Sequence, residues 1–248
     1  ETARGMIFVD DQRHDKQAIP SILIHGAGRT HQGFPLSLRQ LPALNAITPD
    51  LAGHGQSAPT GRTTILDYAL DLLALLDAMQ IPTVNLVGHS MGGAIALQIA
   101  LDFPQRIKRL ILLGTGAQLR VNQQIITGIV EDTDATITMM DKWMYARGTP
   151  AQLQEDMAQQ LKQTAVQVTK GDYIACDGFD MRERLHEIQL PTLIVVGEHD
   201  KMTPPKLSQF LHEHIRNSEL IILPDAGHML MWEQPQATQS TLDAWLNK

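Results

Sequence analysis

Six short apolar segments recur along this 248-residue chain, and each is followed by residues typical of a turn. Strands that are apolar on both faces are typical of parallel sheets that helices cover on each side. Between the segments, runs such as 65–79 carry leucines at helical spacing. The sequence therefore predicts an α/β fold with a mostly parallel central sheet and helices on both faces. The six segments are SILIHG from Ser21, NAITPD from Asn45, VNLVGH from Val84, RLILLG from Arg109, TLIVVG from Thr192 and ELIILP from Glu219.

The alternation of strand and helix stops between residues 119 and 185, where no strand-like segment occurs and several helices are expected. We interpret 119–185 as a helical cap inserted into a core made of residues 1–118 and 186–248. Within the cap, Thr149 precedes Pro150, and a threonine N-cap followed by proline at the first helical position predicts a helix start. A chain of this length is commonly a single α/β domain.

Composition excludes several classes of partner. The formal net charge is -7 and no lysine or arginine cluster occurs, which argues against nucleic-acid binding. The single cysteine, Cys176, excludes an internal disulfide, and no Cys/His spacing indicates a zinc site, so we expect a buried apolar role. No run is long enough to span a membrane and no signal peptide is recognisable, so we expect a cytoplasmic protein of undetermined oligomeric state.

A serine stands between glycines in GHSMGG, where the segment from Val84 gives way to a run with helical spacing. Ser90 therefore lies on the turn between a strand and a helix. The backbones approach closely at such a turn, and glycine at Gly88 and Gly92 removes side chains that would collide. The G-x-S-x-G pattern exposes the serine hydroxyl, which makes Ser90 the predicted nucleophile.

A serine hydroxyl needs a base within hydrogen-bond reach and a third group to orient that base. Asp200 follows the segment from Thr192, and His228 follows the segment from Glu219. The carboxyl ends of parallel strands converge at one edge of a sheet, so both side chains should lie near Ser90. Asp225 and Glu198 are alternative acids; we favour Asp200 because Asp225 is expected to shape the turn before His228.

An oxyanion also needs hydrogen-bond donors. The glycine-rich turn HGAG follows the first apolar segment, so the backbone N–H of Ala27 can point toward the serine, and the N–H of Met91 supplies a second donor. We expect His25, His54 and His89 to brace these turns rather than to act as the base.

Five motifs together carry a resemblance to a known family: HGAG at His25, PDLAGHGQS at Pro49, GHSMGG at Gly88, GEHD at Gly197 and DAGH at Asp225. They resemble the serine hydrolases of the α/β-hydrolase superfamily, in particular carboxylesterases with a helical cap. The resemblance covers nearly all of the chain outside the cap, including the order serine, aspartate, histidine. It implies hydrolysis of a small-molecule carboxylic ester with a small to medium acyl group, through an acyl-enzyme and without a metal or an organic cofactor.

Two other functions remain open. Carbon–carbon bond hydrolases of ring-cleavage products resemble GHMLMWE from Gly227, yet they typically have asparagine in place of His89 and tryptophan in place of Met229. A non-catalytic ligand receptor on the same fold is the second alternative, and the complete set of Ser90, Asp200 and His228 argues against it.

Four residues are candidates for the substrate pocket. Met140 and Met144 in the cap could contact an acyl chain, since thioethers adapt to irregular apolar shapes, although they could equally fill the core of the cap. Arg29 is a candidate partner for a substrate carboxylate, with a structural ion pair as the alternative. Trp232 is a candidate substrate platform, with core packing as the alternative.

Overall fold

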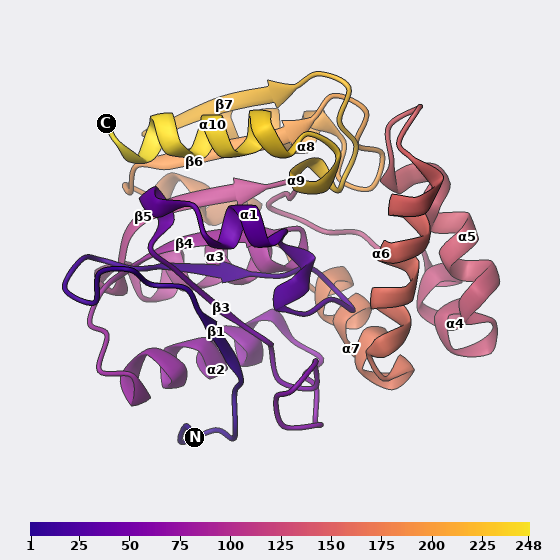
Figure 1. Cartoon of the computed structure of the whole chain (residues 1–248), viewed down its shortest axis with the longest axis horizontal. Coiled ribbons are helices and arrows are strands. Elements are labelled where there is room, and N and C mark those ends of the chain that lie inside the picture. Colours follow the sequence, from indigo (N-terminus) through magenta and orange to yellow (C-terminus); the bar gives the residue numbers. More distant parts are fainter.

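The computed structural model describes residues 1–248 and contains one seven-stranded sheet with the strand order β1-β3-β2-β4-β5-β6-β7. Only β1 runs antiparallel to its neighbour, β3. Helices lie on both faces of this sheet (Figure 1), so the predicted α/β fold is confirmed. The strands are β1 (Val9–Asp11), β2 (Ser21–Ile24), β3 (Ala46–Pro49), β4 (Val84–His89), β5 (Ile107–Leu113), β6 (Thr192–Gly197) and β7 (Ser218–Leu223).

Each of the six predicted segments forms a strand, β2 to β7. The edge strand β1 was not predicted, because its three residues, VDD, are half-buried or exposed and carry no apolar pattern. Its pairing with β3 depends on contacts that local sequence does not encode.

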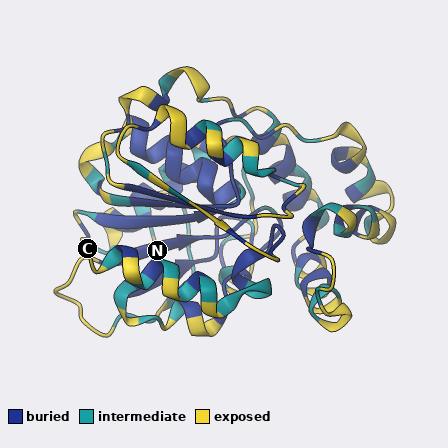
Figure 2. Ribbon diagram, turned by 90° about the horizontal axis from the view of Figure 1, so that it is seen from above, coloured by how far each residue is buried: buried dark blue, intermediate teal, exposed yellow.

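Two apolar clusters lie on the two faces of the sheet. Successive residues of a strand point to opposite faces; accordingly Ile22 and Ile24 belong to one cluster and Leu23 to the other. Figure 2 shows the buried sheet between its helical layers. The first cluster includes residues of α2 (Ile65–Ala78), α3 (Met91–Asp102) and α8 (Pro205–His214), and the second includes residues of α1 (Leu36–Arg39), α9 (Leu230–Glu233) and α10 (Pro235–Leu246).

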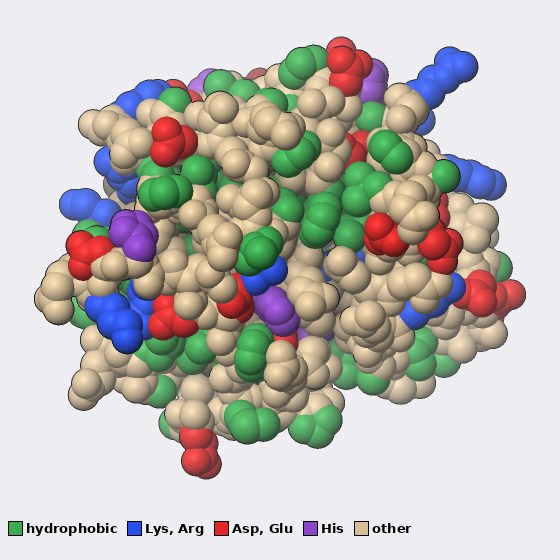
Figure 3. Space-filling model, in the orientation of Figure 1, with side chains coloured by type: hydrophobic (Ala, Val, Ile, Leu, Met, Phe, Trp, Pro, Cys, Tyr) green, Lys and Arg blue, Asp and Glu red, His purple; other side chains and the backbone are tan.

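The region interpreted as a cap contains four helices and no strand. The helices follow β5 in the chain and are α4 (Gln123–Glu131), α5 (Thr133–Met144), α6 (Ala151–Gln163) and α7 (Val166–Asp177). They stand beside the edge toward which the parallel strands point (Figure 1). Hydrophobic side chains gather where these helices meet the core (Figure 3), and the second apolar cluster continues into α4, α5 and α6. None of the helices is both long and apolar enough to span a membrane.

The start of α6 differs from the prediction by one residue. Pro150, rather than Thr149, is the N-cap residue, and it makes no side-chain capping bond. The hydroxyl of Thr149 instead donates to Glu233 Oε2 at 2.8 Å. A tertiary contact with α9 therefore replaces the expected local cap.

Candidate active site

Ser90 occupies a strained turn between β4 and α3. Its φ of 54° and ψ of -118° lie in a region that non-glycine residues rarely adopt, and such strain is concentrated at functional sites. The turn is tight because a side chain at Gly88 would collide with the carbonyl of Gly92, and one at Gly92 would collide with the carbonyl of Ile24. Ser90 N–H donates to Leu113 O at 3.0 Å, which fixes the turn against β5.

His228 and Asp200 meet at the carboxyl end of the sheet. His228 Nδ1 lies 2.9 Å from Asp200 Oδ2. Asp200 also accepts hydrogen bonds from the backbone N–H groups of Met202 and Thr203 and from the Thr203 hydroxyl, at 2.9, 2.8 and 2.7 Å. Burial alone would raise the pKa of Asp200, but the charge and hydrogen bond of His228, with the donors from Thr203, lower it. The carboxylate is therefore ionised and oriented toward the imidazole.

The other two candidate acids lie elsewhere. Asp225 and Glu198 are exposed, and neither is hydrogen-bonded to His228. Asp225 adopts a left-handed conformation, with φ of 53°, in the turn before the histidine. Sequence reasoning did not anticipate Thr203, whose hydroxyl also lies 3.2 Å from His228 Nδ1.

The neighbouring histidine, His89, contacts the backbone of His228. Its Nε2 lies 2.9 Å from His228 O, as expected for a bracing residue. Burial, followed by the nearby charge of His228, lowers the pKa of His89 to about 3. His89 is consequently neutral at physiological pH and donates its Nε2 proton to the carbonyl.

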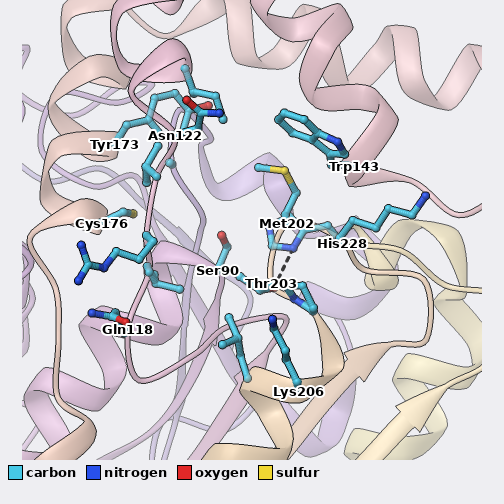
Figure 4. Close-up of a pocket in the computed structure, with 18 residues that line it drawn as sticks. Ser90, Gln118, Asn122, Trp143, Tyr173, Cys176, Met202, Thr203, Lys206 and His228 are labelled. Atoms are coloured by element: carbon cyan, nitrogen blue, oxygen red, sulfur yellow. Dashed lines mark hydrogen bonds between the residues drawn. The ribbon is translucent and has the colours of Figure 1, made fainter.

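Ser90 and His228 line one cavity of about 620 Å³ between the core and the cap. Figure 4 shows the Ser90 hydroxyl directed into this cavity with His228 beside it. Ala27 also lines the cavity. Met91 is the first residue of α3, so its N–H has no partner within the helix, and neither this N–H nor that of Ala27 donates to another protein group. Both groups are available to an oxyanion.

The turn that contains Ala27 is attached to the cap through Asp172. This fully buried carboxylate on α7 accepts from Gly28 N–H at 2.8 Å and from the Tyr68 hydroxyl at 2.5 Å, and it lies 2.8 Å from His54 Nε2. Burial would lower the pKa of His54, but the charge and hydrogen bond of Asp172, together with the hydrogen bond to Ala52 O, outweigh burial and raise that pKa. Sequence motifs gave no indication of Asp172, because its partners come from distant segments.

The four residues predicted for the substrate pocket do not line this cavity. The buried Arg29 guanidinium donates to Met157 O and to Met144 Sδ. Met140 is fully buried and accepts from the Tyr173 hydroxyl, while the Trp232 indole donates to Gly33 O at 2.7 Å. The apolar lining comes instead from Leu119, Val121, Ile125, Trp143, Tyr173, Met202 and Leu207.

No cluster of histidine, cysteine and acidic side chains in the structure could hold a metal ion. Cys176 is buried against the cavity, and burial raises the pKa of its thiol. This thiol is therefore protonated and is a poor nucleophile.

Comparison with known proteins agrees with this fold. Residues 22–239 match the sequence model of the alpha/beta hydrolase family. The chain belongs to that family. It is 31% identical to 3-oxoadipate enol-lactonase 2 of Acinetobacter baylyi, an alignment that covers 82% of this chain and 78% of the relative.

Other relatives differ in their named substrates. The chain is 28% identical to 2-hydroxy-6-oxo-2,4-heptadienoate hydrolase of Pseudomonas putida, over 91% of this chain and 88% of the relative. Among solved structures, a thermophilic esterase is 30% identical in sequence to this chain and superposes with a TM-score of 0.84. The match covers 98% of each chain. This alpha/beta hydrolase family protein is thus similar to enzymes named for different substrates.

Proposed function

We propose that this alpha/beta hydrolase cleaves a carboxylic ester through an acyl-enzyme, with Ser90 as nucleophile, His228 as general base and acid, and Asp200 as the orienting carboxylate. One observation carries the proposal: the His228–Asp200 pair, joined at 2.9 Å, lies at the cavity into which the strained Ser90 turn presents its hydroxyl. This combination of groups is the one that serine hydrolases use.

The mechanism follows from the roles of the atoms. Ser90 Oγ attacks the ester carbonyl while His228 Nε2 takes its proton, and the imidazolium then protonates the leaving alcohol. Water then attacks the acyl-enzyme by the same steps, with His228 again as base and acid, and releases the carboxylic acid and free Ser90. Asp200 fixes the tautomer by accepting from Nδ1, and the free N–H groups of Ala27 and Met91 stabilise the oxyanion. Ser90 and His228 are not hydrogen-bonded to each other here; such bonds often tighten only when substrate binds.

The cavity supports a small to medium acyl group. Its volume of about 620 Å³ lies within the range of ordinary small-molecule sites, and half of its 18 lining residues are hydrophobic. The names of two relatives, an enol-lactonase and a pimeloyl-[acyl-carrier protein] methyl ester esterase, also point to ester or lactone carbonyls.

Carbon–carbon bond hydrolysis is the second candidate, favoured by the similarity to the heptadienoate hydrolase. Trp232, which belongs to the segment GHMLMWE that resembles this class, donates to Gly33 O and does not line the cavity. We therefore keep ester hydrolysis as the first proposal. Assay of a ring-cleavage dienoate beside p-nitrophenyl esters of increasing acyl length separates the two.

The first test is Ser90→Ala, with Ser37→Ala, at an exposed position of α1, as the matched control. We expect the Ser90 variant to lose about 10⁴-fold or more in kcat for the best ester while its Tm is retained. The control should keep both values. A Ser90 variant that retains several per cent of the wild-type rate would refute the assignment of Ser90 as the nucleophile. A folded wild-type protein that neither hydrolyses esters nor reacts with a fluorophosphonate would favour the ligand-receptor alternative.

A further inference from the structure

Three cationic side chains line the cavity that contains Ser90, and no acidic side chain lines it. They are Arg120 from the segment between β5 and α4, Lys201 from the loop after β6, and Lys206 from the first turn of α8. The chain as a whole has a formal net charge of -7. The charge at this cavity is therefore opposite in sign to that of the molecule.

None of the three cations is paired with a carboxylate. No ion pair within 4 Å includes Arg120, Lys201 or Lys206, whereas Arg182 and Arg184 are both paired. Asp180 lies within the field of Arg120, but its carboxylate is already bonded to Arg182 at 2.7 Å and to Gln118 at 2.8 Å. All three charges thus remain available to a ligand.

The position of Lys206 adds a second observation. It lies in the first turn of the ten-residue helix α8, where no acidic residue offsets the positive end of the helix dipole. A cation at this end is unfavourable for the helix, because it faces the positive pole of the dipole. The helix dipole and the lysine both make the potential positive at the same wall of the cavity. In Figure 4 the Lys206 side chain extends along the wall below Thr203 and Ser90.

We propose that this cavity binds esters that carry a second, anionic group, a carboxylate in the simplest case, and that Lys206, Lys201 and Arg120 select it. The proposal rests on the proposed ester hydrolysis and specifies its substrate class. Apolar residues such as Val121 and Ile125 would contact a short methylene chain, and the cations would attract its charged end. A dicarboxylic acid esterified at one end has this form.

The test compares two p-nitrophenyl esters of similar length, the glutarate monoester and the neutral valerate. We expect the wild type to have the higher kcat/KM for the glutarate monoester. In the double variant Lys201→Gln/Lys206→Gln, the ratio of the two kcat/KM values should fall about 10-fold, since exposed charges contribute modestly one by one. Lys108→Gln is the matched control, because Lys108 is exposed and unpaired at the opposite, amino-terminal end of β5. It should leave the ratio unchanged.

Salt gives an independent readout. Raising the salt concentration from about 20 mM to about 500 mM should reduce the preference of the wild type and have little effect on the double variant, because the interaction of exposed charges is screened. A wild type that hydrolyses the neutral ester at least as well as the charged one, at low salt, overturns the proposal. A preference that survives in the double variant overturns the assignment to these lysines.

Direct binding separates this proposal from the proposed reaction. Glutarate should bind to the wild type in calorimetry and glutaramide should not, and the double variant should lose glutarate binding. If no ester is hydrolysed but glutarate binds in this way, ester hydrolysis fails and the anion site stands. If esters are hydrolysed and glutarate neither binds nor inhibits competitively, the anion site fails and ester hydrolysis stands.

Discussion

At the scale of single residues, the carboxylates of Asp200 and Asp225 have contrasting surroundings. Asp200 is 2% exposed and faces His228 with donors on its other sides. Asp225 is exposed in a left-handed turn position that asparagine also tolerates. Replacing either residue with asparagine changes the charge and keeps the shape, so the pair of variants isolates the function of each carboxylate.

We expect Asp200→Asn to lower kcat about 10⁴-fold, because the imidazole loses the acceptor that fixes its tautomer. Asp225→Asn should stay within about 3-fold of wild type in kcat and should unfold at nearly the same temperature. Kinetics and thermal unfolding of both variants check this. A collapse of the rate in Asp225→Asn alone would show that the acid is misassigned.

At the scale of secondary-structure elements, helix α7 holds the cap against the loops around the cavity. Asp172 on α7 bonds to Gly28, Tyr68 and His54, which belong to three different segments of the core. The Thr164 hydroxyl, between α6 and α7, adds a bond to Gly28 O at 3.0 Å. The turn that contains Ala27 and Gly28 is therefore positioned partly by these two helices.

We expect Asp172→Asn to lower the free energy of unfolding by about 3 kcal/mol, because removing one partner of a buried ion pair leaves the other unsatisfied. It should also slow the labelling of Ser90 by a small phosphonate, since Gly28 loses its anchor. Asp156→Asn on the exposed face of α6 is the control and should change neither quantity measurably. Unaltered stability and labelling in Asp172→Asn would contradict this role of α7.

At the scale of the whole molecule, buried histidines contribute to the response of stability to acid. Burial lowers the pKa values of both His25 and His89, the second to about 3. In the unfolded chain these residues take up protons near pH 6.5. Their contribution to the free energy of unfolding is therefore fully present above that pH and is lost as the pH falls toward their pKa in the folded state. His54 has a raised pKa and behaves oppositely, so its contribution is retained in acid and lost as the pH rises through its folded pKa.

We expect His89 alone to account for a loss of about 3 kcal/mol in the free energy of unfolding between pH 7 and pH 4. Urea unfolding at a series of pH values measures this loss. The variant His89→Phe lacks the titrating group and should lose less stability over the same interval. If the variant and the wild type lose stability equally, the buried neutral state of His89 is not the cause.

The sequence alone determined the α/β fold, the family and six of the seven strands. It also supplied the pairing of Asp200 with His228 as an expectation that agrees with the observed contact at 2.9 Å. These features depend on local periodicity, or on the rule that parallel strands bring the loops at their carboxyl ends together.

Only the tertiary structure decided which side chains surround the cavity. Arg29, Met140 and Met144 were candidates for it, but Arg29 contacts Met144 and Met140 is buried against Tyr173, whereas Trp143 and Lys206 line the cavity. The same sequence pattern suits a cap core and a substrate pocket, because both require apolar helical faces. The orientation of the cap helices on the sheet, which no local pattern encodes, separates the two roles.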